Sequence, residues 1–305
     1  MRSHSGKPVV SVTPKGQHMI YPVVLAGLKN GTEMAKGAMI PAHFCAEGPG
    51  ASPLQSVLHG LDHPMFAAPT VVACAAQRFV AVQQMEAVGA TGEVLVEPCQ
   101  SKSAALMAAL ALRFQHDPEA LLLILPAEHA DVRNEAFRRA IENAMQIAFG
   151  GNLVLLTGEG VGSYGHVRAL SRVRGGQPVQ ALFSATAADH PDDPQCFESA
   201  GVYLVRAGSL LSAFKRHAPR LLQATKRAVE GMQQGAGFLR LAPEAYGRVK
   251  AESFETAVLS RMQTVVAISP DGPLESGAAE TRASVEAWRT PMNPAGHIMV
   301  DSLAA

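Results

Sequence analysis

Residues 121–129 read LLLILPAEH, a run of five large aliphatic residues that ends in a proline and, two positions later, a carboxylate. A short unbroken apolar run of this kind is typical of a strand buried on both faces of a parallel sheet. Ligands of parallel α/β sheets bind outside the carboxyl ends of the strands, so Glu128 follows the strand where a ligand is expected. Its carboxylate could hold Mg²⁺ beside phosphate groups. The alternative is an ordinary solvated acid that leads into the next helix.

Apolar strands and amphipathic helices alternate along the chain on both sides of this run. We predict further strands at 19–26, 70–75, 93–96, 152–156, 201–206 and 264–268. We predict helices at 53–61, 76–88, 103–114 and 134–149, one long helix at 209–232, and a surface loop at 184–195. Alternation of this kind indicates an α/β fold with a mixed, mostly parallel central sheet flanked by helices. One domain is expected over 19–290, after a flexible extension at 1–18 and before a tail at 291–305.

Composition excludes several classes of protein. The 305 residues carry 26 Lys and Arg against 26 Asp and Glu, which argues against a nucleic-acid-binding protein. With 48% hydrophobic residues the chain can build a large core. No apolar run reaches the roughly 18 residues of a membrane span, and residues 1–17 lack the apolar segment of a secretory signal. Four widely spaced cysteines without a CxxC pair are typical of reduced thiols, so we expect a cytoplasmic protein.

Glycines follow the first predicted strand, where the sequence reads Leu25-Ala26-Gly27-Leu28-Lys29-Asn30-Gly31-Thr32. Glycine lets backbone N–H groups approach a phosphate chain. The segment matches neither GxGxxG nor GxxxxGK[ST], so by itself it favours an ordinary turn between strand and helix.

Two further segments carry candidate ligand-binding residues. After the third strand, Glu97 precedes Lys102 and Ser103 at the start of an Ala/Leu-rich helix. Ser103 is a favourable N-cap, and Lys102 there could meet an anion, although such a lysine is more often merely solvated. The segment 162–166, GSYGH, has two glycines that would let the backbone approach a sugar ring, but it is equally compatible with a hairpin. The eleven histidines show no HxH or HExxH spacing, so a histidine metal site is not supported.

In this order the segments resemble the bacterial mannose-1-phosphate guanylyltransferases, members of the sugar-1-phosphate nucleotidyltransferase superfamily. The resemblance runs from about Tyr21 to Val300. The family's LAGGxGT and PKQF segments correspond to 25–32, with one extra residue, and 41–44, its EPxGRNTAPA to 97–105, and its LLVLPADH to 122–129. Its TGYGYI, NSGMFLFRA and ESIDYAVME correspond to 162–167, 199–207 and 252–259. Several motifs in register make this match specific, although no single one decides it.

The resemblance implies a Rossmann-like nucleotidyltransferase fold. The family joins GTP and mannose 1-phosphate into GDP-mannose and diphosphate with Mg²⁺, for nucleotide-sugar and polysaccharide biosynthesis. It further implies binding of a nucleotide or sugar nucleotide, and allows a homo-oligomer or a partner from polysaccharide biosynthesis. The implied nucleotide-binding residues are Leu25, Ala26, Gly27, Gly31, Thr32, Glu97 and Ser103. The implied sugar-binding residues are Tyr164, Gly165, Ser199 and Glu255, and Glu128 is the implied metal ligand.

The chain departs from the family pattern where phosphate chemistry needs positive charge. Glu33 stands where the family has an arginine, and Ala42 where it has a lysine. Leu28 replaces a glycine, and Ser101-Lys102 replaces Arg-Asn. Each lost cation can cost roughly 10²–10³ in rate.

Two hypotheses follow from these departures. In one, the chain is a working nucleotidyltransferase whose catalytic cations are Lys29, Lys36 and Lys102. In the other, it is a catalytically weakened or inactive relative that binds a nucleotide, a sugar nucleotide or a protein partner. The charge pattern favours the second hypothesis, and the ancestry favours the first.

Overall fold

The structure is a computed structural model that describes residues 19–27, 41–46, 50–98, 103–157, 166–173, 177–184 and 196–268. In chain order its strands are β1 (Ile20–Ala26), β2 (Thr70–Cys74), β3 (Glu93–Glu97), β4 (Leu121–Pro126), β5 (Leu153–Thr157), β6 (His166–Val173), β7 (Gln177–Ser184), β8 (Cys196–Arg206), β9 (Gln233–Gln234), β10 (Phe238–Arg240) and β11 (Val265–Ile268). Its α-helices are α1 (Pro53–Gly60), α2 (Arg78–Ala87), α3 (Ser103–Arg113), α4 (Glu135–Phe149), α5 (Ala207–His217), α6 (Pro219–Glu230), α7 (Pro243–Gly247) and α8 (Phe254–Ala257). Short 3₁₀ turns are η1 (Ala42–Phe44), η2 (Ala130–Arg133) and η4 (Leu259–Arg261).

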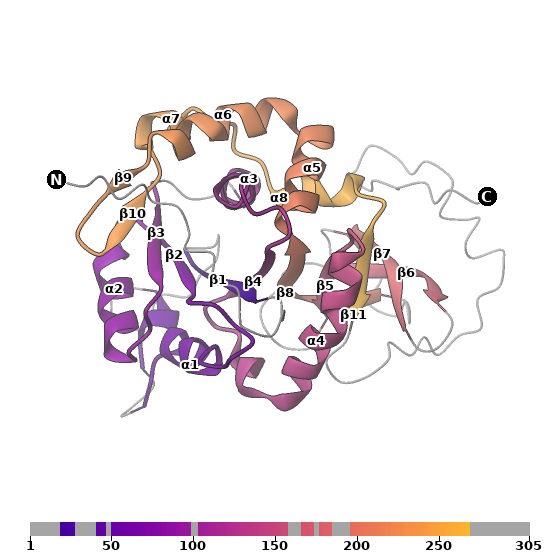
Figure 1. The fold of residues 1–305 in the computed structure, drawn as a ribbon, viewed down its shortest axis with the longest axis horizontal. Helices are drawn as coiled ribbons and strands as arrows, with labels where there is room; N and C mark the ends of the chain where they lie inside the picture. Colours follow the sequence, from indigo (N-terminus) through magenta and orange to yellow (C-terminus); the bar gives the residue numbers. More distant parts are fainter. Residues whose placement is uncertain are drawn as a thin grey trace.

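One mixed sheet joins the described strands in the order β5-β11-β7-β6-β8-β4-β1-β2-β3-β10-β9 (Figure 1). Strands β3, β2, β1 and β4 are parallel neighbours, and β8 pairs antiparallel with β4. Beyond β8, strand β5 pairs antiparallel with it and parallel with β11. The predicted mixed α/β fold is therefore confirmed.

Helices cover both faces of this sheet. Helices α3, α5, α6 and α7 lie on one face, and α1, α2 and α4 lie on the other (Figure 1). Successive residues of a strand point to opposite faces, so the central strands divide between two buried clusters. Val23 and Leu122 belong to the cluster beneath α3, whereas Val24 and Leu123 belong to the cluster against α4. This burial on both faces explains why the central strands are continuous apolar runs.

The long helix predicted at 209–232 is wrong, because the structure breaks it into α5 and α6. The break falls at Ala218, whose backbone has φ −140° and ψ 51°, and Pro219 begins α6. Proline has no backbone N–H and disfavours helical geometry in the residue before it, so the chain ends one helix and starts another.

The second half of the chain holds elements that the sequence pattern did not predict. Strands β6 and β7 form an antiparallel pair, and β9, β10, α7 and α8 are short additions. Of the predicted loop at 184–195, Ser184 ends β7 and the rest lies outside the described residues. The predicted domain limits at 18 and 290 also fall outside them. None of the helices in the described part of the chain has the length and apolar character that crossing a membrane requires.

Candidate functional site

The sheet has a topological switch point between β1 and β4. From β1 the chain adds β2 and β3 on one side and then returns to place β4 on the other. Leu25 pairs with Pro126, and the Ala127 N–H donates to the Leu25 carbonyl at 3.1 Å. In open α/β sheets this point, at the carboxyl ends of the strands, is where ligands bind. The predicted residues Leu25, Ala26 and Gly27 therefore lie beside the segment that carries Glu128.

A histidine that sequence reasoning missed supports the end of β1. His43, in η1, is buried, and its Nε2 lies 3.2 Å from the Ala26 carbonyl oxygen. A carbonyl only accepts, so this contact assigns the proton to Nε2. The only sequence signal was the position of residues 41–44 in the family alignment. The neighbouring Ala42 is half-buried at the same edge.

Glu97 at the end of β3 carries a buried carboxylate that reaches toward β1. Its Oε1 accepts a hydrogen bond of 2.6 Å from the hydroxyl of Tyr246 in α7, which is fully buried. Its Oε2 lies 4.0 Å from the position that a Cβ atom would take at Gly27. The structure therefore brings together two predicted nucleotide-binding residues that are 70 positions apart in the sequence, and it adds Tyr246 as the group that orients the carboxylate.

Removing the hydroxyl that holds Glu97 should destabilise the fold. We expect Tyr246→Phe to lower the free energy of unfolding by about 1–3 kcal/mol, because a buried carboxylate loses a hydrogen bond while the ring volume is kept. The matched control is Tyr203→Phe, whose hydroxyl donates to the half-buried Glu255 over a longer 3.3 Å. Urea unfolding of both variants measures the difference. Equal losses in the two variants would contradict the special role of the Tyr246–Glu97 bond.

Ser103 links the start of α3 to the segment that carries Glu255. Its hydroxyl oxygen accepts from the Phe254 N–H at 2.9 Å, and the Ala104 N–H donates to the Glu252 carbonyl at 3.2 Å. Ser103 itself is exposed. A predicted nucleotide-binding residue therefore lies directly beside the predicted sugar-binding segment.

The predicted sugar-binding residues Ser199 and Glu255 lie around β8. Ser199 is buried, and its hydroxyl oxygen accepts from the Gly201 N–H at 3.1 Å. Gly201 has φ +68°, and the pairing with β5 shifts here, so β8 bulges beside the carboxyl end of β5. Glu255 accepts from Tyr203, whose pKa is raised well above 10 by burial and by the charge of Glu255. The phenol therefore stays protonated at neutral pH and acts as a donor.

Glu128 is exposed directly after β4. Among the residues that the structure describes, no three His, Cys, Asp or Glu side chains gather into a metal-binding cluster. Mg²⁺ is usually bound by one or two carboxylates together with substrate phosphates and water. A single exposed carboxylate therefore suits a metal ion that arrives with a phosphorylated ligand, and does not form a protein cage for one.

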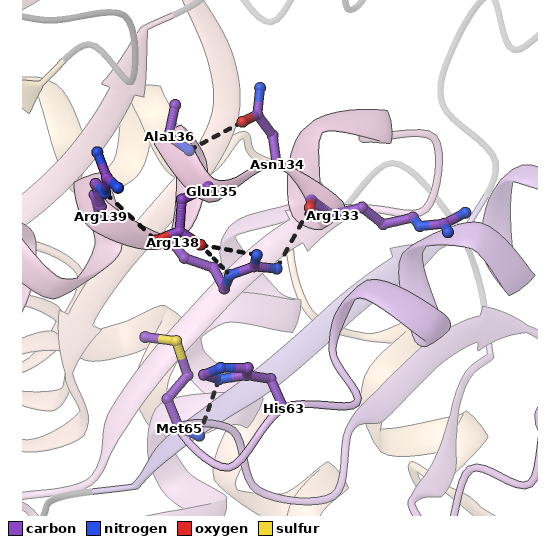
Figure 2. A network of polar contacts seen from close by, with 8 residues as sticks. All are labelled: His63, Met65, Arg133, Asn134, Glu135, Ala136, Arg138 and Arg139. Carbon is purple, nitrogen blue, oxygen red and sulfur yellow. Dashed lines mark hydrogen bonds and ion pairs between the residues drawn. The ribbon is translucent and has the colours of Figure 1, made fainter.

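Hydrogen bonds at the start of α4 hold the segment that follows Glu128 in place (Figure 2). Asn134 caps this helix by accepting from the Ala136 N–H at 2.9 Å. Arg138 donates to Glu135 at 2.9 Å and to the Arg133 carbonyl at 3.3 Å, as Figure 2 shows. The hydrogen bond from Arg138 lowers the pKa of Glu135. These bonds fix the turn between β4 and α4.

Several predicted site residues lie outside the described part of the chain. They are the candidate catalytic residues Lys29, Lys36 and Lys102, the nucleotide-binding residues Gly31 and Thr32, and the sugar-binding residues Tyr164 and Gly165. Glu33, Leu28 and Ser101 also lie outside it. Their roles stay predictions from the sequence.

Solved structures confirm the class of fold. A Helicobacter pylori protein described as mannose-6-phosphate isomerase matches with a TM-score of 0.67 and 18% identity, over 83% of this chain and 98% of that one. A Thermus thermophilus protein described as mannose-1-phosphate geranyltransferase matches with a TM-score of 0.62 and 18% identity, over 83% of this chain and 74% of that one. The chain therefore shares the Rossmann-like α/β fold of these two proteins.

Comparison with curated protein sequences identifies a more specific similarity. Mannose-1-phosphate guanylyltransferase of Escherichia coli is 27% identical over 89% of this chain and 60% of its own length. The Salmonella typhimurium protein of the same name, ManC, is 28% identical over 92% of this chain and 62% of its own length. The xanthan biosynthesis protein XanB of Xanthomonas campestris is 29% identical over 69% of this chain and 46% of its own length. No family model matches the chain.

The chain is therefore similar in sequence to mannose-1-phosphate guanylyltransferases, as its motifs predicted. It spans about three fifths of the length of the E. coli and S. typhimurium relatives.

Proposed function

We propose that this chain is a mannose-1-phosphate guanylyltransferase-like protein of polysaccharide biosynthesis that binds a nucleotide or sugar nucleotide at the carboxyl edge of its sheet, and that its guanylyl transfer is strongly slowed or lost. The observation that supports this site best is the placement of the Glu97 carboxylate beside Gly27 at the switch point. A carboxylate there accepts hydrogen bonds from the N–H groups of a base or from ribose hydroxyls. The glycine leaves room for the phosphate chain to pass the backbone.

Guanylyl transfer requires little covalent chemistry from the protein. An oxygen of the sugar phosphate attacks the α-phosphorus of GTP in line, and diphosphate leaves. The protein positions the two substrates and neutralises the charge that develops on the phosphate oxygens. In this proposal Lys29, Lys36 and Lys102 are the cations available for that task, and Glu33 opposes them.

Mg²⁺ fits the proposal through Glu128. When bound, the ion neutralises phosphate oxygens, and the exposed Glu128 supplies the protein's carboxylate for it. The sugar lies on the β8 side, where Glu255 accepts from sugar hydroxyls while Tyr203 orients its carboxylate. Ser199 supports this side by holding the Gly201 bulge. The widely spaced cysteines, which are typical of reduced thiols, support a cytoplasmic location in this proposal.

A second candidate function is a non-catalytic subunit that binds a sugar nucleotide and regulates a partner in polysaccharide assembly, or a second copy of itself. The substitutions that favour it are Glu33 and Ala42, which remove two cations from the phosphate-binding segment and add an acid. This candidate and the impaired enzyme share one property: both bind a nucleotide without turning it over at an ordinary rate.

Glu128→Gln tests the metal part of the proposal. We expect wild-type protein to bind GTP more tightly with Mg²⁺ than without it, and the variant to lose that gain by at least about tenfold, because an amide is a weaker ligand for this ion. The matched control is Glu142→Gln, an exposed carboxylate on α4. Titration calorimetry with and without Mg²⁺ measures both. A variant that keeps the full Mg²⁺-dependent gain would overturn the assignment.

A further inference from the structure

A polar hollow of about 490 Å³ lies at the edge of the sheet opposite the candidate site. It adjoins the amino ends of the parallel strands, because Arg206 pairs with Leu121 at the start of β4 and the Thr264 carbonyl accepts from the first residue of β5 at 2.8 Å. Its polar lining includes Arg206, Ser209, Ser212, Arg216, His217 and Arg261. The hollow is therefore separate from the edge that carries Glu97 and Glu128.

The lining of this hollow is cationic. Three arginines and a histidine contribute to it from the end of β8, from α5 and from η4, and the described residues of its lining include no Asp or Glu. Arg206 is also paired, at 3.0 Å, with the exposed Glu119, which is not among the lining residues. Basic residues in the last turn of α5 stabilise that helix end, which accounts for Arg216 and His217. Stabilisation of the helix end does not account for Arg206 and Arg261, which belong to β8 and η4 and line the same hollow.

The hydrogen bonds of the hollow hold its cations in place. Arg261 donates from Nη1 to the His217 carbonyl at 3.3 Å, and Arg206 donates from Nε to the Ser209 hydroxyl at 3.4 Å. Arg216 is exposed and has no carboxylate partner among the described residues. Burial, and then the charges of Arg216 and Arg261, lower the pKa of His217. Like charges that are held together in this way favour an anion between them.

The cationic lining continues past His217 and Arg261 into a second hollow of about 560 Å³. This one adds Arg220 and Lys250, and also Glu252, whose carboxylate lies 3.8 Å from the Lys250 ammonium. It also meets the start of α6, a helix of 12 residues with no acidic residue in its first turn and no side-chain cap. The partial positive charge of that helix end adds to the field of the side chains.

We propose that the hollow between β8, α5 and η4 is a binding site for a small phosphorylated anion. Guanidinium groups present paired donors that match phosphate oxygens, and the hydroxyls of Ser209 and Ser212 can donate beside them. The lining combines several cations with two hydroxyls, which suits a ligand with more than one charge. This assignment does not depend on the proposed transferase function, because it uses none of the residues of the carboxyl edge.

Titration calorimetry with pyrophosphate tests the site. We expect wild-type protein to bind pyrophosphate here, Arg216→Gln to weaken that binding at least about tenfold, and Lys215→Gln to change it by less than about twofold. Lys215 is exposed on the same helix but lines neither hollow. Both variants remove one positive charge, so only the position of that charge differs between them. Binding at the carboxyl edge would be unaffected by either variant.

The pKa of the His217 imidazole shows whether the ligand binds in this hollow. An anion beside it favours the charged form, so pyrophosphate should raise the pKa of His217 measured by NMR, whereas the NMR signals of the exposed His59 should not move when pyrophosphate is added. Citrate, which carries carboxylates instead of phosphates, should bind more weakly than pyrophosphate. Absence of pyrophosphate binding, equal weakening by Lys215→Gln, an unmoved His217 pKa or equally tight citrate binding would each overturn the proposal.

Discussion

We expect the double variant Glu33→Arg with Ala42→Lys to bind GTP about a hundredfold more tightly than the wild-type chain. The first change exchanges a carboxylate that repels the triphosphate for a guanidinium that binds it, and the second adds an ammonium at the half-buried start of η1. A hydrogen bond to a charged group contributes about 1.5–3 kcal/mol, and about 1.4 kcal/mol corresponds to a factor of ten. Two such bonds therefore account for the expected gain.

The control for this experiment is Glu142→Arg with Gln146→Lys. Both residues are exposed on α4, and the net increase in charge is the same. General attraction between a more basic protein and an anion would raise GTP affinity equally in the two double variants. An unchanged affinity in Glu33→Arg with Ala42→Lys would mean that residues 28–40 do not face the nucleotide, and the ligand would then have to bind elsewhere.

The central strands and the main helices could be predicted because their signals are local. A strand buried on both faces is an apolar run, and Leu121 to Leu125 form one. The apolar face of α4 was equally clear, and Phe137, Ile141 and Ala144 are all fully buried. Strands β6 and β7 could not be predicted in this way, because HVRALSRV and QPVQALFS mix polar and apolar residues. Such strands are defined by their pairing with each other, which is a long-range property.

The candidate site could be predicted only in part. The family motifs identified Gly27, Glu97 and Glu128, and the structure places all three at the carboxyl ends of central strands. They gave no indication of Tyr246, which lies 149 positions from Glu97 and reaches it through the packing of α7. The family motifs also did not indicate that Pro219 divides one predicted helix in two. The proline alone was the signal in the sequence, because proline disfavours a helix interior. Partners that come from distant segments are visible only once the chain is folded.

The second large effect concerns turnover of the wild-type protein. The family places cations where this chain has Glu33, Ala42 and Ser101, and each missing cation at a phosphate can cost roughly 10²–10³ in rate. If the three losses are only partly offset by Lys29, Lys36 and Lys102, the rate should still fall by at least about 10⁴. Ordinary enzymes turn over about 10 times per second, so we expect fewer than about 10⁻³ turnovers per second from GTP and mannose 1-phosphate.

The measurement that tests this account most directly is release of diphosphate by wild-type protein supplied with GTP, mannose 1-phosphate and Mg²⁺. GTP binding is measured by calorimetry on the same preparation, so that a slow rate is not mistaken for an unfolded sample. The account predicts saturable GTP binding together with a turnover number below about 10⁻³ per second. A turnover number near 10 per second would contradict it, because the remaining lysines would then supply all the charge that the reaction needs.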